Sequence, residues 1–134
     1  MRSHHVSAWI EAAPDAVYNY ASNPAHLTKW AAGLAESGLR QTADGWVANS
    51  PMGEVVVEFV APNTFGVLDH VVRLPSGEAV YNPMRILPGG VDAANSEVVF
   101  TVRQRAGMSD EQFDADVAAV AADLETLRAL LEAR

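Results

Sequence analysis

The sequence predicts an α+β fold, in which an antiparallel sheet of six or seven strands packs against one long C-terminal helix. Short segments of alternating apolar residues lie between residues 39 and 105, separated by tight turn signals. Residues 109–134 instead repeat apolar side chains at helical spacing. Short connections imply antiparallel pairing, and helices kept apart from the strands favour α+β over α/β. We expect a single domain over residues 1–134, because no repeat or linker interrupts the pattern.

A first strand and two short helices are predicted at the N-terminal end. Val6, Ala8 and Ile10 occupy alternate positions, which is the pattern of a strand with one apolar face. Pro14 suits the first turn of a helix, and Asn23 suits the cap of a second helix. Such short helices are not stable alone and must pack on the sheet. Their expected inward positions are Val17, Tyr18, Ala21, Leu27, Trp30 and Leu34.

The middle of the chain is predicted to form the rest of the sheet. Turn signals at residues 43–45 (ADG) and 75–77 (PSG) join neighbouring segments as hairpins. The loop at residues 88–95 (PGGVDAAN) is rich in glycine and small residues, so we interpret it as another hairpin loop. The predicted strands cover residues 39–42, 46–49, 53–60, 65–74, 78–87 and 95–105.

The long helix has a well-marked beginning. Ser109 suits the N-cap, and Gln112 three residues later completes a capping box. Met108 and Phe113 stand at the two positions of a hydrophobic staple, which sets the angle at which the chain enters the helix. The helix is therefore expected to lie across the sheet with one apolar stripe facing inward. The stripe comprises Phe113, Val117, Val120, Ala121, Leu124, Leu127 and Leu131.

Composition excludes several functional classes. The net charge of −8 disfavours binding to nucleic acid and to anionic membrane surfaces. No apolar run is long enough for membrane insertion. The absence of cysteine is typical of a reducing compartment, so we expect a cytoplasmic protein. The four histidines lack metal-ligand spacing, and no phosphate-binding or nucleophile motif is present. We therefore expect neither a metal nor a cofactor.

Three segments carry a family resemblance. They are IEAAPDAVYNYASNPAHLTKW at residues 10–30, NPMRILP at 82–88, and SEVVFTV at 96–102 before the long helix. In this order and spacing they resemble the SRPBCC superfamily of START-like and Bet v 1-like domains, which includes polyketide cyclase/dehydrase families. The resemblance covers the whole chain.

The resemblance implies a helix-grip fold, in which a strongly curved antiparallel sheet holds the C-terminal helix and leaves a cavity between them. Members of the superfamily use this cavity for apolar or aromatic ligands, and some have turned it into an active site. Their activities range from lipid carriage to aromatase/cyclase chemistry, so the fold does not determine the function.

Strand alternation selects His70 as the main candidate for chemistry. Alternate residues of a strand point to opposite faces. In residues 65–74 one face carries Leu68, His70, Val72 and Leu74, and the other carries Val67, Asp69, Val71 and Arg73. The first face is the more apolar, so His70 is expected to point inward. If residues 75–77 form a three-residue loop, equal steps place His70 opposite Asn82 on the next strand. This polar pair could orient a carbonyl or hydroxyl group, and His70 could act as an acid or base near neutral pH.

A shift of one residue in this register gives a different site. Asp69, Tyr81 and Arg85 would then point inward and His70 would point outward. In that arrangement Arg85 could hold a carboxylate or phenolate, with Asp69 balancing its charge. Aromatic and flexible apolar residues are expected to complete the lining of the cavity, or alternatively to pack as core. These residues are Trp30, Met52, Phe59, Met84 and Phe100.

Two functions follow as hypotheses. The first is a binding module that holds a small apolar or aromatic molecule, with His70 and Asn82 setting its orientation. The second is an enzyme of the cyclase/dehydratase type, in which His70 moves the proton. Unpaired strand edges would also allow a homodimer.

Overall fold

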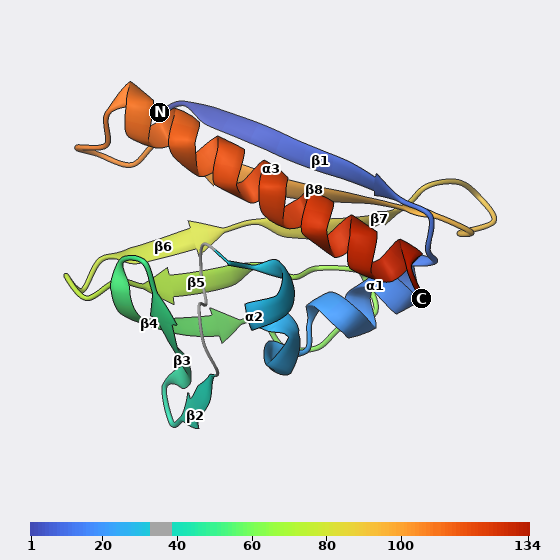
Figure 1. Cartoon of the computed structure of the whole chain (residues 1–134), viewed down its shortest axis with the longest axis horizontal. Helices are drawn as coiled ribbons and strands as arrows, with labels where there is room; N and C mark the ends of the chain where they lie inside the picture. Colours follow the sequence, from blue (N-terminus) through green and yellow to red (C-terminus); the bar gives the residue numbers. More distant parts are fainter. Residues whose placement is uncertain (33–38) are drawn as a thin grey trace.

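The computed structural model describes residues 1–32 and 39–134, so the predicted inward position of Leu34 lies outside the described residues. The described chain forms eight strands, three α-helices and one short 3₁₀ helix (Figure 1). In order they are β1 (Ser3–Ile10), α1 (Pro14–Ala21), η1 (Pro24–His26), α2 (Leu27–Trp30), β2 (Arg40–Thr42), β3 (Gly45–Ser50), β4 (Gly53–Phe59), β5 (His70–Arg73), β6 (Ala79–Asn82), β7 (Met84–Pro88), β8 (Ser96–Arg103) and α3 (Asp110–Glu132).

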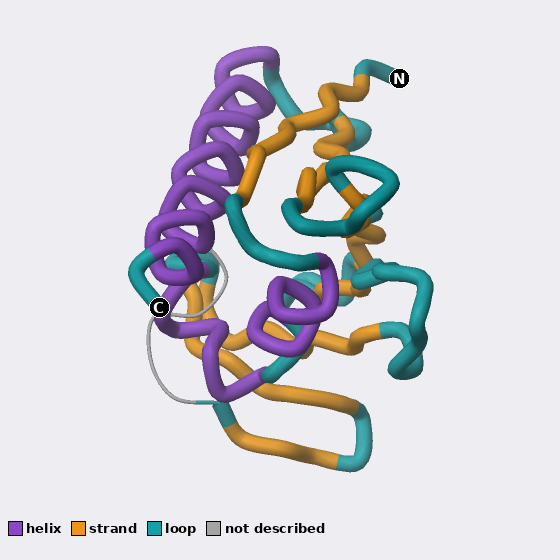
Figure 2. The backbone as a smooth tube through the Cα atoms, turned by 90° about the vertical axis from the view of Figure 1, so that its right-hand side faces the viewer, coloured by secondary structure: helices purple, strands orange, loops and turns teal. Residues whose placement is uncertain are grey.

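The strands form two antiparallel sheets, and the predicted α+β helix-grip architecture is confirmed. One sheet has the order β1-β8-β7, and the other has the order β2-β3-β4-β5-β6. α3 runs the length of the molecule against β1 and β8, while α1 lies near its C-terminal end and α2 lies under its C-terminal half (Figures 1 and 2). No helix within the two described ranges is long and apolar enough to cross a membrane.

The prediction of one strand over residues 78–87 was wrong, because Pro83 divides it into β6 and β7. Proline has no backbone N–H and does not donate to a strand ladder. The carbonyl of Pro83 accepts a hydrogen bond from Thr101 N at 2.9 Å, so the chain changes its partner strand at this residue. β6 pairs with β5 before the break, and β7 pairs with β8 after it. This division raises the number of strands from seven to eight.

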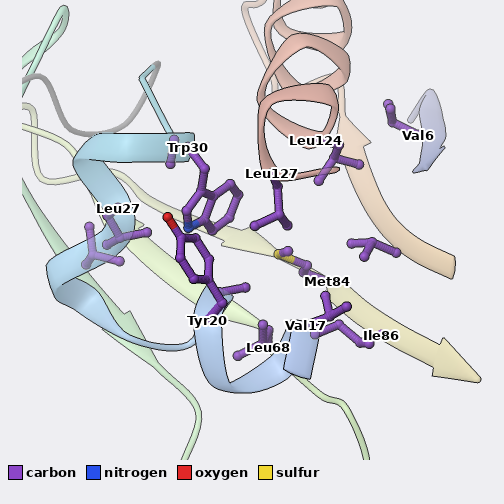
Figure 3. Close-up of a cluster of buried hydrophobic side chains, with 14 of the residues drawn as sticks. Val6, Val17, Tyr20, Leu27, Trp30, Leu68, Met84, Ile86, Leu124 and Leu127 are labelled. Carbon is purple, nitrogen blue, oxygen red and sulfur yellow. The ribbon is translucent and has the colours of Figure 1, made fainter. Parts of the chain in front are cut away.

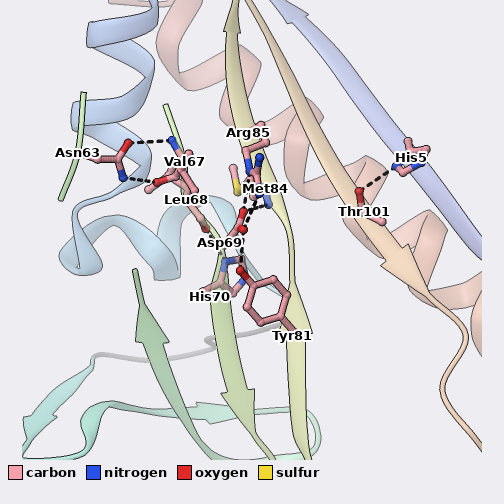
Figure 4. Close-up of polar contacts among 10 residues, drawn as sticks. All are labelled: His5, Asn63, Val67, Leu68, Asp69, His70, Tyr81, Met84, Arg85 and Thr101. Atoms are coloured by element: carbon pink, nitrogen blue, oxygen red, sulfur yellow. Dashed lines mark hydrogen bonds and ion pairs between the residues drawn. The ribbon is translucent and has the colours of Figure 1, made fainter. Parts of the chain in front are cut away.

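The predicted strand over residues 65–74 is also shorter than expected. Only His70–Arg73 pairs as a strand, while Val67 forms an isolated bridge with Arg85. The side chain of Asn63 organises the preceding segment, since its Oδ1 accepts hydrogen bonds from Phe65 N at 3.0 Å and Val67 N at 3.1 Å. Its Nδ2 donates to the Val67 carbonyl at 2.9 Å (Figure 4). Two backbone bonds also join this segment to β7, from Leu68 N to the Met84 carbonyl and from Ile86 N to the Gly66 carbonyl, both at 2.8 Å.

The register of the β5–β6 hairpin agrees with the prediction. Leu74 N donates to the Glu78 carbonyl at 2.9 Å, which closes the three-residue loop. Equal steps back from this pair place His70 directly opposite Asn82. His70 is buried and Asn82 is half-buried.

α3 begins as the sequence predicts. Ser109 Oγ accepts a hydrogen bond from Gln112 N at 3.1 Å, and Gln112 Oε1 accepts one from Ser109 N at 2.9 Å. The stripe, however, is not buried evenly along its length. Phe113 near one end is buried, whereas Val117 and Val120 are half-buried. The middle of the helix therefore packs less closely on the sheet than its ends.

The hydrophobic core lies toward the C-terminal half of α3. There the helix meets α1, α2 and β7, and their apolar side chains interdigitate (Figure 3). Leu127 and Ile86 are essentially inaccessible to solvent. The residues labelled in that cluster are Val6, Val17, Tyr20, Leu27, Trp30, Leu68, Met84, Ile86, Leu124 and Leu127.

Candidate functional site

A cavity lies where α3 packs least closely on the sheet. It has a volume of about 190 Å³ and is bounded by α2, α3 and strands of both sheets. Most of its lining is apolar, with a few polar and charged groups. The lining residues are Leu27, Trp30, Ala31, Met52, Phe59, His70, Val72, Leu74, Val80, Asn82, Phe100, Val102, Arg105, Asp116, Ala119, Val120, Asp123 and Leu124.

His70 stands between two aromatic rings on the sheet side of the cavity. The Phe59 ring centroid lies 5.3 Å from that of His70, and the Phe100 centroid lies 5.6 Å away at an interplanar angle of 68°. Phe59 comes from β4 and Phe100 from β8, so the imidazole lies between strands of the two sheets. This packing holds the ring in one orientation.

The hydrogen bond of His70 sets its tautomer. Nδ1 lies 2.9 Å from the Leu68 carbonyl, an acceptor, so Nδ1 carries the proton and Nε2 presents a lone pair. Nε2 makes no hydrogen bond within the described chain. Burial lowers the pKa of His70 below its usual 6.5, against smaller opposing effects of the Leu68 carbonyl and Asp69. At neutral pH the cavity therefore holds a neutral imidazole with an unused acceptor.

The lowered pKa of His70 predicts a pH dependence of stability. Because the folded pKa is below the unfolded value of 6.5, the unfolded chain binds a proton that the folded chain excludes. The contribution of neutral His70 to the free energy of unfolding is thus fully present above pH 6.5. It is lost as the pH falls through 6.5 toward the folded pKa. We expect the free energy of unfolding, measured with urea, to fall less between pH 7.5 and pH 5.5 in His70→Gln than in the wild type.

The matched control for this measurement is His4→Gln, which changes an exposed histidine on β1. We expect its stability to fall with pH as the wild type does. If His70→Gln and His4→Gln lose the same stability on acidification, burial does not govern the titration of His70.

Asn82 and Trp30 add polar groups to the lining. Asn82 Nδ2 donates to the carbonyls of Val80 at 3.2 Å and His70 at 3.5 Å, which leaves its Oδ1 for a ligand. Trp30 is only 4% exposed, yet its Nε1 has no hydrogen-bond partner among residues 1–32 and 39–134. Leaving a buried N–H unpaired costs about 1–3 kcal/mol. A bound molecule or water that accepts from Trp30 would recover that energy.

Three charged residues complete the lining, and sequence reasoning missed all of them. Arg105 follows β8 and forms an ion pair with Glu78 at 2.6 Å. Asp116 and Asp123 lie on the face of α3 that borders the cavity. Asp116 stands four residues before Val120 and Asp123 three residues after it, so all three lie on one face of the helix. Val120 is half-buried in the same lining. This spacing in the sequence could have indicated that the two aspartates border the cavity.

The alternative site of Asp69, Tyr81 and Arg85 exists as a cluster, but it does not line the cavity. Asp69 was expected on the solvent side of its strand, and instead it is only 2% exposed. Its Oδ1 accepts from Met84 N and Arg85 Nε, both at 2.9 Å. Its Oδ2 accepts from Arg85 Nη2 at 2.8 Å and the Tyr81 hydroxyl at 2.7 Å (Figure 4). Hydrogen bonds from Arg85 lower the pKa of Asp69 far below its usual range.

The structure thus separates the predicted site residues into two groups and a core residue. Met84 was expected in the lining, but it is buried in the core and is not among the described lining residues. The cluster of Asp69, Tyr81 and Arg85 joins the strands on either side of Pro83. The cavity brings together the other six predicted residues, which are Trp30, Met52, Phe59, His70, Asn82 and Phe100.

Comparisons with known proteins agree on the fold. No protein-family model matches the chain, and no curated protein gives a significant match. Among solved structures, the protein XoxI from Bacillus cereus is 14% identical with a TM-score of 0.73, covering 98% of this chain and 96% of that one. An uncharacterised protein from Bacillus thuringiensis is 12% identical with a TM-score of 0.74, covering 97% and 98%.

A third similar structure is the Zhui aromatase/cyclase from a Streptomyces species. It is 14% identical with a TM-score of 0.72, and the alignment covers 98% of this chain and 93% of that chain. At identities this low, the structural similarity shows a shared fold and no more, and one fold is compatible with several activities.

Proposed function

We propose that the protein binds a small apolar or aromatic molecule in the cavity between α3 and the sheets, as a member of the SRPBCC superfamily. One observation carries the proposal: the mostly apolar lining of the cavity includes Trp30, whose buried Nε1 has no partner among the described residues, and His70, whose Nδ1 bond to the Leu68 carbonyl leaves Nε2 as an acceptor. Apolar pockets with a few convergent polar groups are typical of small-molecule sites. The similar structure of an aromatase/cyclase supports the same use of the fold.

The volume of the cavity limits the size of the molecule. An engineered protein cavity of about 150 Å³ holds benzene, and drug-sized pockets begin at about 300 Å³. At about 190 Å³ this cavity suits one or two aromatic rings rather than a long acyl chain. Burial of roughly 150 Å² of ring surface contributes about 4 kcal/mol, so hydrogen bonds must supply much of the selectivity.

A matched pair of ligands tests the proposed role of His70 in binding. 2-Naphthol and naphthalene share two rings, but only 2-naphthol can donate a hydrogen bond to Nε2. His70→Phe keeps an aromatic ring and removes the acceptor, so the dissociation constant for 2-naphthol should rise about tenfold while that for naphthalene changes little. Titrations followed by tryptophan fluorescence would measure both values.

Two results would contradict the proposal in different ways. If neither naphthalene nor 2-naphthol binds the wild-type protein, the cavity does not hold molecules of this size. If His70→Phe binds 2-naphthol as tightly as the wild type does, His70 does not orient the ligand.

The second candidate function is catalysis of the cyclase/dehydratase type, with His70 as acid or base. The observation that favours it is the tautomer of His70, since a neutral imidazole with an unused lone pair can accept a proton from a bound carbon acid or hydroxyl. Turnover of a short poly-β-ketone that His70→Phe abolishes would support this reading. Turnover retained in that variant would exclude His70 as the catalytic group. A cytoplasmic location and a homodimer stay predictions from the sequence.

A further inference from the structure

We propose, building on the binding function above, that Trp30 selects neutral aromatic ligands that carry a hydrogen-bond acceptor, such as a carbonyl oxygen. Trp30 Nε1 would donate to that oxygen, while the ring of the ligand lies among the apolar side chains of the cavity. His70 would contact a different group of the ligand, because its Nε2 accepts a hydrogen bond whereas Trp30 Nε1 donates one. The inference rests on the burial of Trp30, on its missing partner and on the charges of the lining.

The position of Trp30 is set by its packing. It is the last residue of α2, and its side chain projects toward α3 (Figure 3). Trp30 belongs both to the hydrophobic core and to the lining of the cavity, and it is only 4% exposed. The indole N–H is therefore held away from bulk water.

The indole nitrogen of Trp30 is exceptional in this protein. Among the fully buried side-chain nitrogen and oxygen atoms of residues 1–32 and 39–134, it is the one without a hydrogen-bond partner. Native proteins pair nearly all such atoms with protein groups, ordered water or a ligand. An indole N–H can only donate, so its partner must offer a lone pair. Neither a hydrocarbon nor an ammonium group does so, whereas a carbonyl oxygen does.

The charges of the lining restrict the acceptor to a neutral group. Arg105 is the basic residue among the described lining residues, and its guanidinium lies 2.6 Å from the carboxylate of Glu78. His70 adds no positive charge, because burial lowers its pKa and keeps the imidazole neutral. A carboxylate bound at Trp30 would thus be buried without a cation of its own, which is unfavourable. A carbonyl oxygen accepts the same hydrogen bond without that cost.

Three ligands with one skeleton test the inference. Acetophenone, α-methylstyrene and benzoate each carry a planar three-atom group on a benzene ring. The group contains a carbonyl in acetophenone, a C=CH₂ bond in α-methylstyrene and a carboxylate in benzoate. The shapes are nearly the same, so differences in binding report hydrogen bonding and charge. We expect benzoate to bind at least about tenfold more weakly than acetophenone.

The indole N–H resonance of Trp30 gives a direct measurement on the wild type. The ¹⁵N-labelled full chain would be titrated with acetophenone and with α-methylstyrene, and the resonance assigned by elimination with Trp9→Phe and Trp46→Phe. Ring-current effects are common to both ligands, whereas only the ketone accepts a hydrogen bond. We therefore expect the N–H proton of Trp30 to resonate further downfield with acetophenone than with α-methylstyrene.

The variant Trp30→Phe tests whether this hydrogen bond contributes to affinity. Water solvates a carbonyl better than a C=CH₂ group, so the informative quantity is the dissociation constant of acetophenone divided by that of α-methylstyrene. Phenylalanine removes the donor and leaves the same extra space for both ligands. The ratio should rise about tenfold in Trp30→Phe.

Trp9→Phe is the matched control for this ratio. Trp9 Nε1 already donates to Glu11 Oε1 at 2.7 Å, and Trp9 is not among the lining residues. The same substitution at this position should leave the ratio unchanged.

A second control concerns the hydroxyl of Tyr20, which belongs to the same core cluster as Trp30. Tyr20→Phe keeps the ring and removes the oxygen. In the ligand-free protein it should leave the Trp30 N–H resonance in place. An upfield shift in Tyr20→Phe would show that Trp30 already donates to Tyr20, and it would overturn the inference.

The other contrary results have distinct meanings. If both neutral ligands bind but acetophenone produces no additional downfield shift, the inference is overturned and the proposed binding function stands. A ratio that is the same in Trp30→Phe and the wild type would overturn it as well. Tighter binding of benzoate than of acetophenone would contradict the restriction to neutral ligands. If neither neutral ligand binds, the proposed function fails and the inference fails with it.

Discussion

Replacement of Asp69 by alanine is expected to lower the free energy of unfolding by about 3 kcal/mol. The buried carboxylate accepts four hydrogen bonds, including two from the guanidinium of Arg85 and one from the backbone of Met84. Arg85 is half-exposed and can be solvated after the change, but Met84 N would lose its acceptor in a buried position. Loss of the backbone acceptor and of the bidentate ion pair together accounts for the size of the effect.

The position of Asp69 explains why its bonds matter for the fold. The chain passes from one sheet to the other at Pro83, where the strand ladder is interrupted. Asp69 bonds to Tyr81 before this residue and to Met84 and Arg85 after it. The carboxylate therefore links the two strands on either side of the interruption.

A surface carboxylate provides the control for Asp69→Ala. Glu58 on β4 forms an ion pair with Arg73 at 3.8 Å, and both side chains are more than half exposed. Glu58→Ala should change the free energy of unfolding by about 0.5 kcal/mol or less. Urea denaturation of both variants would measure the difference. Equal losses would show that the Asp69 cluster adds no more stability than an ordinary surface pair.

The same cluster predicts a loss of stability in acid. Hydrogen bonds from Arg85 hold the folded pKa of Asp69 well below its ordinary value of 3.8, against the opposing effect of burial. The contribution of Asp69 to the free energy of unfolding is therefore complete above the unfolded pKa. It declines as the pH falls below about 4 toward the folded pKa. In Asp69→Ala this part of the acid denaturation curve should be flatter than in the wild type.

Gly66→Ala is expected to lower the free energy of unfolding by at least about 3 kcal/mol. Gly66 has φ of +73°, and a Cβ atom added there would lie 2.2 Å from the Ile86 carbonyl oxygen. The two backbones cannot separate freely, because Ile86 N donates to the Gly66 carbonyl at 2.8 Å. A side chain therefore adds a backbone clash to the strain of a left-handed conformation.

Gly77→Ala separates these two effects. Gly77 also has positive φ, at +92°, but a Cβ atom added there would meet nothing within 4 Å. This variant should lose only about 1 kcal/mol, the cost of the conformation alone. Thermal and urea unfolding would compare the two. A loss in Gly66→Ala no larger than that in Gly77→Ala would show that the Gly66–Ile86 approach relaxes easily.

The sequence by itself determined the features that depend on neighbouring residues. Ser109 and Gln112 form the predicted capping box because the motif spans a single turn of helix. The register of His70 opposite Asn82 was predictable because a three-residue loop fixes the pairing of a hairpin. The apolar alternation that turns His70 and Phe100 toward the cavity is equally local.

Only the tertiary structure decided what depends on distant segments. Alternation placed Asp69 on the solvent side of its strand, yet the strand shift at Pro83 brings Arg85 over it and buries it. Asp116 borders a cavity because the middle of α3 packs loosely on the sheet. Helix periodicity indicates which residues share a face, but it does not indicate how closely that face packs on the sheet. Side-chain direction is set by local backbone geometry, whereas burial and charge compensation arise when separate segments of the chain are packed together.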